Sequence, residues 1–390
     1  MLHVRLAAVG RGTMQRKAKT TGWKDKILFT PGPLTTSETV KQAMLRDLGS
    51  RDSEFIGLAK DVKDKLVELG QAGPDEYTAV LMQGSGTFGL EAVVSSTIPP
   101  HGKLLVIVNG AYGKRIAQIA SVLKIDTAIL ECPENTTPDP GQIEAALEAD
   151  PQISEVAVVH CETTTGIINP IEQIGRIVKK SGAKYFVDAM SSFGAVPIDL
   201  AECNIDYLVS SANKCIEGVP GFSFILCKLS SLKETAGYAR SLSFDLLAQY
   251  RGFEKNGQFL FTPPTHVLLA FRQALAELDA EGGVKGRADR YSNNYKILVA
   301  GMRQMGFKEY LRPEDQGYII TSFLYPEDNN FHFDDFYERL NKRDYVIYPG
   351  KVSDADCFRI GNIGRIFESD VRSLLTVIRE TITEMDVKLK

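Results

Sequence analysis

One lysine stands between two strand-like runs, in a segment made mostly of small residues. Residues 210–221 read SSANKCIEGVPG, after the run Ile205–Val209 and before Phe222–Leu226. Small residues and glycine allow a planar ligand to approach the backbone closely. Burial lowers the pKa of a lysine, and the free amine of Lys214 could then form a Schiff base with an aldehyde. A lone lysine is more commonly a strand-end residue with its ammonium in water, so this interpretation depends on the rest of the chain.

A glycine-rich turn, Gly84–Gly89 (GSGTFG), follows a predicted strand and opens a predicted helix. It matches the dinucleotide fingerprint G-x-G-x-x-G, which also needs an acidic residue near the end of the next strand. That strand, Lys103–Val108, is followed by Asn-Gly and has no such acid. We therefore interpret the turn as a phosphate site, in which helix N–H groups and the hydroxyls of Ser85 and Thr87 hold the anion. The alternative is a glycine turn needed only for close packing.

Three further side chains follow strands and could contact a planar ring. Tyr112 lies at a strand-to-helix turn and could stack on the ring, although a single tyrosine is more commonly a packing residue. Thr163, in the polar run His160–Gly166, could hydrogen-bond a ring substituent; His160 alone reads as an interior histidine. Asp188 ends the strand Lys184–Val187 and could hold a protonated ring nitrogen. Its alternative role is to cap a turn.

The elements that position these residues alternate between strands and helices. The pattern predicts strands at Thr78–Met82, Lys103–Val108, Thr127–Glu131, Glu155–His160, Lys184–Val187, Ile205–Val209 and Phe222–Leu226. It predicts helices at Glu38–Leu48, Phe55–Leu69, Thr87–Ser96, Lys114–Leu123, Gly141–Glu148 and Ile171–Ser181. This alternation indicates an α/β fold with a mostly parallel, seven-stranded, doubly wound sheet. Ligands bind such sheets at the carboxyl ends of the strands, where the side chains named above are expected.

The C-terminal part of the sequence has a different pattern. Helices are predicted at Val267–Glu281, Gly286–Met305, Phe333–Asn341 and Glu368–Met385, with strands at Tyr318–Leu324, Tyr345–Tyr348 and Cys357–Ile360. We expect a basic extension over 1–24, a large domain over 25–277 and a smaller α+β domain over 278–390.

Three segments carry a family resemblance: Phe29–Thr36 (FTPGPLTT), Ser211–Cys215 (SANKC) and Phe358–Gly364 (FRIGNIG). Together with the order of the strand-end residues, they resemble the class V pyridoxal-phosphate aminotransferases, which have fold type I. The resemblance is closest to members that transfer the amino group of 2-aminoethylphosphonate to pyruvate. It implies formation of phosphonoacetaldehyde and L-alanine, in phosphonate catabolism, by a homodimer with shared active sites.

The resemblance also implies a role for each candidate residue. Lys214 would form the Schiff base with pyridoxal phosphate, and Asp188 would pair with the pyridine nitrogen. The other implied cofactor contacts are Ser85, Gly86 and Thr87 at the phosphate with Asn213 beside it, Tyr112 on the ring, Thr163 at the phenolic oxygen and Thr262. Thr262 belongs to the segment Phe259–His266 (FLFTPPTH), through which a partner subunit reaches the phosphate in this family. No metal is implied.

Arg359 is the candidate for substrate binding. In the strand Cys357–Ile360 it is predicted to point opposite to Phe358 and Ile360. A planar guanidinium suits the carboxylate of pyruvate and the phosphonate of the amine, which would occupy the site in turn. The alternative is an ion pair on an edge strand.

Other functions remain open at this point. An alanine–glyoxylate or serine–pyruvate transaminase belongs to the same class. Cysteine desulfurase shares the fold but needs an exposed nucleophilic cysteine on a loop, whereas Cys215, Cys227 and Cys357 lie in strand-like surroundings. A nicotinamide-dependent oxidoreductase would depend on the glycine-rich turn, which lacks its acidic partner. A non-catalytic binding protein would have no need of Lys214.

Composition favours a globular protein with small-molecule substrates. The net charge is −4 over 390 residues, which gives no reason to expect nucleic acid or a membrane surface as a partner. The six cysteines are widely spaced without a C-x-x-C pair, which disfavours a zinc cluster or disulfide framework and suits the cytoplasm. Met1–Lys24 is basic and lacks acidic residues, so it is either an organelle transit peptide or, as we favour, a disordered extension.

Overall fold

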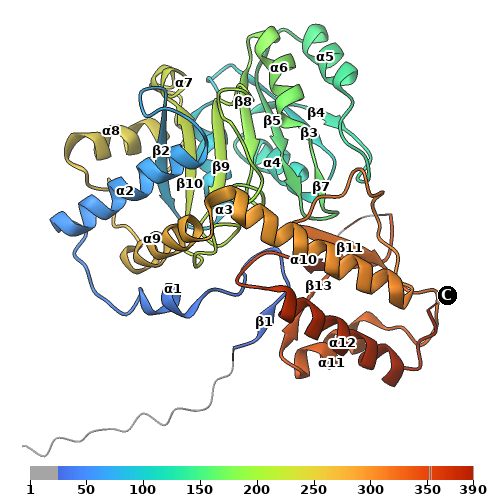
Figure 1. Ribbon diagram of the computed structural model, residues 1–390. Coiled ribbons are helices and arrows are strands. Elements are labelled where there is room, and N and C mark those ends of the chain that lie inside the picture. The colour runs from blue at the N-terminus through green and yellow to red at the C-terminus, as the bar shows by residue number, and fades with distance from the viewer. Residues whose placement is uncertain (1–24, 351, 353, 390) are drawn as a thin grey trace, which may run out of the picture.

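The computed structural model describes residues 25–350, 352 and 354–389, so the predicted basic extension lies outside the described residues. A large sheet flanked by helices forms one part of the molecule, and a smaller C-terminal layer packs at one end of it (Figure 1). No helix among the described residues is both long and apolar enough to cross a bilayer.

The large sheet has seven strands in the order β2-β10-β9-β8-β5-β3-β4, which confirms the prediction of a mostly parallel, seven-stranded α/β sheet. Of these strands, β10 alone runs opposite to the other six, since it pairs antiparallel with both β2 and β9. β10 is the next strand after β9 in the chain. The loop between them, which contains Lys214, therefore reverses the chain direction at the carboxyl end of β9. The strands are β2 (Tyr77–Gln83), β3 (Lys103–Val108), β4 (Asp126–Glu131), β5 (Ile153–Val159), β8 (Lys184–Asp188), β9 (Tyr207–Ser211) and β10 (Phe222–Lys228).

Helices cover both faces of this sheet because successive strand residues point to opposite sides. In β5, Val156 and Val158 face one core while Ala157 and Val159 face the other. The first core is closed by α2 (Ser53–Leu69), α5 (Pro140–Ala149), α6 (Ile171–Ser181) and α9 (Thr265–Ala280). The second is closed by α3 (Gly86–Ser96), α4 (Ala111–Val122), α7 (Leu229–Glu234) and α8 (Leu246–Asn256).

The C-terminal layer has its own sheet, in which β14 is the middle strand of β11-β14-β13. These strands are β11 (Ile320–Leu324), β13 (Tyr348–Pro349) and β14 (Cys357–Gly361), packed with α10 (Gly283–Met305), α11 (Phe333–Lys342) and α12 (Glu368–Glu384). The first described residues join this layer, since β1 (Ile27–Leu28) pairs with β12 (Tyr345–Val346) and Phe29 lies in the C-terminal core. The domain boundary near residue 278 stays a prediction.

Short elements were the weakest part of the sequence prediction. Helix α1 covers only Glu38–Gln42, not Glu38–Leu48, and the apolar Leu45 beyond it is 85% exposed. Helices α7 and α8 were missed; α8 buries only three residues, so its apolar periodicity is weak. A small hairpin of β6 (Cys161–Glu162) and β7 (Ile167–Ile168) was also missed, and it carries the loop of Thr163.

Two helical glycines provide a test of this packing. A Cβ at Gly175 in α6 would lie 1.9 Å from the carbonyl oxygen of Cys203, whereas one at Gly57 in α2 would have no neighbour within 4 Å. We expect Gly175→Ala to lower the free energy of unfolding by about 1–3 kcal/mol through overpacking. Gly57→Ala should raise it by about 0.5–1 kcal/mol, because alanine favours the helix. Urea unfolding of both variants measures the difference, and a loss of stability in Gly57→Ala would contradict the packing described.

Candidate active site

Most of the predicted site residues lie at the carboxyl ends of the strands of the large sheet. Asp188 is the last residue of β8, and Lys214 lies in the loop between β9 and β10. Ser85 precedes α3, Tyr112 lies in the first turn of α4, and Thr163 lies in the β6–β7 loop. This placement follows from the parallel order of the strands, which brings their carboxyl ends to one edge.

Lys214 is covered by the segment that contains Pro31 and Gly32. Its Nζ donates a hydrogen bond of 2.6 Å to the carbonyl oxygen of Pro31. Gly32 has φ +110°, and a Cβ there would lie 2.7 Å from Lys214 Cδ, so only glycine allows this approach. Burial lowers the pKa of Lys214, against the opposing effects of Tyr112, Cys215, Asp188 and Cys161. The site therefore shifts Lys214 towards the free amine relative to a lysine in water.

Asp188 is a buried carboxylate near this lysine. Its Oδ1 accepts the N–H of Met190 at 2.9 Å. Burial raises the pKa of Asp188 to about 6, while the Met190 N–H and the positive charges of Lys214 and Arg115 act to lower it. A cationic ligand atom at this carboxylate would further favour its ionised form.

His160 is an interior histidine, in agreement with its interpretation from sequence. It is 4% exposed, and its Nδ1 lies 2.9 Å from Ser192 Oγ. Burial lowers the pKa of His160 to about 4, so the ring is neutral near pH 7. Its backbone N–H donates to the Asp188 carbonyl at 2.8 Å and so fixes the end of β8.

The glycine-rich turn presents the start of α3 to the site. Ser85 occupies the N-cap position with an extended backbone, and its side chain makes no cap hydrogen bond. The hydroxyl and the first-turn N–H groups are therefore suited to an anion. Close packing also contributes here, since a Cβ at Gly86 would lie 2.1 Å from Met190 Sδ.

Arg115 is a site residue that the sequence interpretation missed. Its Nη1 lies 3.5 Å from Thr87 Oγ1, and its guanidinium lies 4.9 Å from the centre of the Tyr112 ring. It thus places a positive charge between the phosphate turn and the predicted stacking residue. The spacing of three residues from Tyr112 on one helix face could have indicated it.

Arg359 is 3% exposed and faces the loop of Thr163. Its Nε donates to the Pro349 carbonyl at 2.9 Å, and its Nη1 donates to the Thr163 carbonyl at 2.8 Å. Phe358 and Ile360 point into the C-terminal core, as predicted. The edge-strand alternative is wrong, because β14 pairs with a strand on each side.

Thr262 and Asn213 lie at the margin of the site. The Gln83 side chain, at the end of β2, donates to the Thr262 carbonyl at 2.9 Å, which places this segment beside the phosphate turn of its own chain. The Thr262 side chain is exposed. Asn213 is half-buried beside Lys214, and its carbonyl oxygen would lie 2.8 Å from a Cβ at Gly32.

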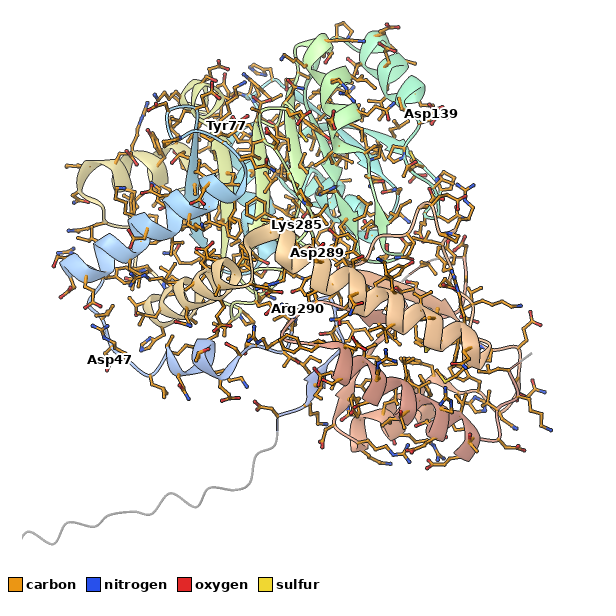
Figure 2. The ribbon with its side chains drawn as sticks, in the orientation of Figure 1. Asp47, Tyr77, Asp139, Lys285, Asp289 and Arg290 are labelled. Atoms are coloured by element: carbon orange, nitrogen blue, oxygen red, sulfur yellow. The ribbon has the colours of Figure 1, made fainter. Side chains whose placement is uncertain are left out.

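A buried ion cluster, also missed from sequence, fixes the loop that carries Lys214. Glu217 Oε1 accepts from Arg290 Nη2 and from the Tyr291 hydroxyl, each at 2.6 Å. Arg287 donates to the carbonyl of Cys215, the residue after Lys214. These partners belong to α10, on which Figure 2 labels Arg290. The loop is thereby joined to the helix between the two layers.

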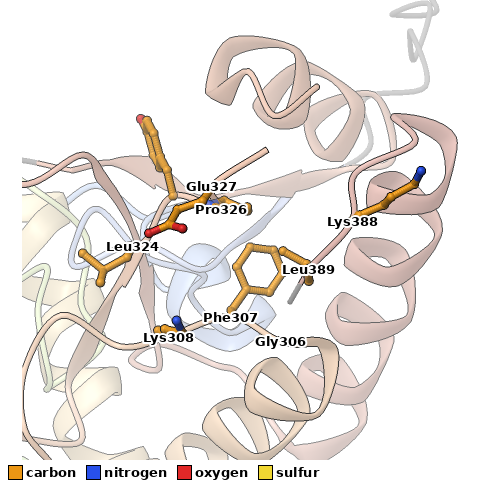
Figure 3. A pocket seen from close by; sticks show the side chains of 9 residues that line it. Gly306, Phe307, Lys308, Leu324, Pro326, Glu327, Lys388 and Leu389 are labelled. Atoms are coloured by element: carbon orange, nitrogen blue, oxygen red, sulfur yellow. The ribbon is translucent and has the colours of Figure 1, made fainter. Parts of the chain in front are cut away.

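The cavity in the C-terminal layer is separate from this site. One cavity of about 150 Å³ lies in the C-terminal layer (Figure 3), and none of the candidate residues lines it. Its lining consists of Gly306, Phe307, Lys308, Leu324, Tyr325, Pro326, Glu327, Lys388 and Leu389. No group of three or more His, Cys, Asp or Glu side chains suited to a metal lies among the described residues.

Comparison with known proteins defines the class. The family model for class-V aminotransferases matches residues 35–353, and the chain belongs to this family. It is a pyridoxal-phosphate aminotransferase of fold type I, and its residues fit that cofactor. A buried amine at Lys214, the carboxylate of Asp188 and an uncapped helix start match the aldehyde, ring nitrogen and phosphate of pyridoxal phosphate.

Relatives and solved structures narrow the comparison. The chain is 50% identical over 358 residues to the 2-aminoethylphosphonate–pyruvate transaminase of Salmonella heidelberg, which covers 91% of this chain and 97% of that protein. The protein of the same name from Syntrophobacter fumaroxidans is 52% identical over 357 residues, covering 91% and 96%. The structure of pyridoxamine–pyruvate aminotransferase from Mesorhizobium loti superposes with a TM-score of 0.85 at 25% identity, covering 94% of each chain. Membership of this family excludes the nicotinamide-dependent alternative.

Proposed function

We propose that this chain transfers the amino group of 2-aminoethylphosphonate to pyruvate, giving phosphonoacetaldehyde and L-alanine. The observation that carries the proposal is a sequence identity of 50–52%, across 91% of the chain, to proteins named 2-aminoethylphosphonate–pyruvate transaminase. The buried Arg359 supports it, because both substrates carry an anionic group.

Lys214 and Asp188 are proposed as the catalytic residues. When bound, pyridoxal phosphate supplies an electrophilic carbon and a ring that accepts electrons from the substrate carbon. Lys214, with its pKa lowered by burial, would attach the cofactor and then move a proton at the substrate carbon as a general base and acid. Asp188 would hold a proton on the ring nitrogen, which requires its carboxylate to be ionised.

The remaining candidate residues would bind and orient the cofactor. We propose that Tyr112 stacks on its ring, that Thr163 contacts the phenolic oxygen, and that Ser85, Gly86 and Thr87 hold the phosphate with Asn213 nearby. The uncapped start of α3 and the neighbouring charge of Arg115 support an anion there.

Arg359 would bind the anionic end of each substrate in turn. Its middle-strand position and its hydrogen bonds to two carbonyl groups support a fixed guanidinium. An alanine–glyoxylate or serine–pyruvate transaminase is the second candidate, because the same arginine also suits a carboxylate. The cysteine desulfurase alternative has less support: five of the six cysteines are buried, and burial raises the pKa of Cys215 to about 12.

Assembly and location are also proposed. We propose a cytoplasmic homodimer in which Thr262 of each chain completes the phosphate site of the other. Exposed apolar side chains near this segment, Leu260 at 43% and Phe261 at 39%, support burial against a second copy. The widely spaced cysteines support a reducing compartment.

The activity test uses purified protein with pyridoxal phosphate, 2-aminoethylphosphonate and pyruvate. We expect alanine and phosphonoacetaldehyde to form in equal amounts, as measured by chromatography and by an aldehyde reagent. Lys214→Ala should lower the rate by at least about 10²–10⁴-fold, since it removes the general base. Faster turnover of alanine with glyoxylate or of serine with pyruvate would favour the second candidate. A Lys214→Ala variant that retains more than a tenth of the wild-type rate would exclude Lys214 as a catalytic residue.

Substrate binding is tested with Arg359→Lys, which keeps the charge but loses the planar donor pair. We expect KM to rise for both substrates and kcat/KM to fall about tenfold to a hundredfold, the range of a hydrogen bond to a charged group. Arg303→Lys, at an exposed arginine of α10 paired with Glu309, is the control and should leave both constants unchanged. A rise in KM for pyruvate alone would place the phosphonate elsewhere.

The shared phosphate site is tested by mixing two inactive or weakened chains, Lys214→Ala and Thr262→Ala. If Thr262 acts across the interface, the mixed dimer contains one intact site, so activity at low cofactor concentration should rise above the sum of the separate variants. If Thr262 serves its own chain, no mixed site is intact. Activity that does not increase after subunit exchange would therefore contradict the proposal.

A further inference from the structure

Glu162 is a fully buried carboxylate at the site, and none of the roles above includes it. It ends β6, and its two oxygens accept hydrogen bonds from different elements. Oε2 accepts the N–H groups of Tyr112 at 3.0 Å and Gly113 at 3.4 Å. Oε1 accepts the N–H of Thr164 at 3.3 Å and its hydroxyl at 2.9 Å.

On one side, Glu162 replaces the missing cap of α4. The N-cap residue of this helix is Gly110, which has no side chain to accept the first N–H groups. A Cβ at Gly110 would lie 2.3 Å from Glu162 Cδ, so the glycine leaves room for the carboxylate. A negative charge at this position also interacts favourably with the positive end of the helix. The turn that carries Tyr112 is thus held by a residue from another element.

On the other side, Glu162 holds the loop that carries Thr163. The Thr163 carbonyl accepts the Nη1 donor of Arg359 at 2.8 Å, so this loop positions the arginine. One carboxylate therefore connects the turn of the predicted stacking residue with the loop that orients the predicted substrate-binding residue.

We propose that Glu162 is a positioning residue that fixes Tyr112 and Arg359 relative to each other, and so sets the affinity for both the cofactor and the substrate anion. This inference rests on the proposed function insofar as Tyr112 contacts the cofactor and Arg359 the substrate.

The charge of Glu162 matters to this connection. Burial raises the pKa of Glu162 to about 7, while its donors from Thr164, Tyr112 and Gly113 act to lower it. The charge of Glu162 acts to raise the pKa of Cys161, on the same strand, and of Arg359, on β14, and the side chain of Tyr112, on α4, also interacts with Arg359. The ionised carboxylate accepts hydrogen bonds from all four donors. As the pH falls through 7, a proton added to one carboxylate oxygen faces these donors and weakens their hydrogen bonds. The connection should therefore strengthen as the pH rises.

Glu162→Gln tests the proposal, with Glu155→Gln as a matched control. Glu155 is also fully buried, accepts the Thr97 hydroxyl at 3.0 and 3.1 Å, and has its pKa raised by burial to about 8. It lies near the start of β5, where no candidate site residue is found. The full-length proteins, purified without cofactor, are titrated with pyridoxal phosphate, and the dissociation constant is read from the visible absorbance. KM for 2-aminoethylphosphonate and for pyruvate is then measured between pH 6 and 9.

In Glu162→Gln, the amide NH₂ must face donors on one side, so we expect the cofactor dissociation constant and both KM values to rise about tenfold or more. The acid-side increase in KM of the wild type should disappear, whereas Glu155→Gln should match the wild type in every constant. Glu162→Gln within twofold of the wild type, or an equal loss in Glu155→Gln, would overturn the proposal. If Glu162→Gln does not fold, Thr164→Val, which removes one donor, should shift the same constants by a smaller factor; no shift there would overturn it.

The two proposals fail separately. Cofactor binding is measured without substrate, so a weakened Glu162→Gln complex would support positioning of Tyr112 even if 2-aminoethylphosphonate were not the amino donor. Conversely, a wild type active with both substrates and a Glu162→Gln variant with unchanged constants would leave the proposed function standing alone.

Discussion

The shielding of the Lys214 amine from water is the constraint on which the rest of the structure depends. The lysine is covered by Pro31 and Gly32, from the beginning of the described chain. That segment is itself held by the C-terminal layer, since the Gly361 N–H donates to the Phe29 carbonyl at 2.9 Å and the Arg365 N–H to the Thr35 carbonyl at 2.7 Å. The pKa of Lys214 therefore depends on packing between residues 29–35 and residues 361–365, which lie far from it and from each other in the sequence.

The loop that carries Lys214 needs a second constraint, because its backbone is strained. Glu217 has φ +66°, a conformation that costs energy for a residue with a Cβ and persists only when its surroundings fix it. The buried Arg287 and the partly buried Arg290 provide this, with Glu281 bringing the cluster to two positive and two negative charges. Removing one member would leave an unpaired buried charge, which is far more costly than the net contribution of the intact cluster.

The sequence allowed prediction of the large sheet and of where the candidate residues on it lie, because both follow from local periodicity and from the parallel order of strands. Asp188 and Lys214 could be placed at one edge for that reason. The packing of Gly32 against Lys214 and the ion cluster around Glu217 could not be predicted, since each joins residues far apart in sequence through tertiary packing. Arg115 and Glu162 could have been predicted from the sequence. Arg115 follows Tyr112 by about one helix turn, and Glu162 is a carboxylate in a run of polar residues. Their partners, however, are visible only in three dimensions.

The division of the site between two layers explains how the same sheet can serve different substrates. Asp188 ends one strand of the large sheet and Lys214 lies in the loop after another, whereas Arg359 belongs to the sheet of the C-terminal layer. With the proposed roles of these residues, the distance between the amine of Lys214 and a substrate anion at Arg359 is set by the contact between the layers, which includes the hydrogen bond from Arg359 to the Thr163 carbonyl. A change at this contact would alter which anion fits without disturbing the amine or the carboxylate. Specificity for the length and charge of the substrate can thus vary within the class while the chemistry proposed for Lys214 is retained.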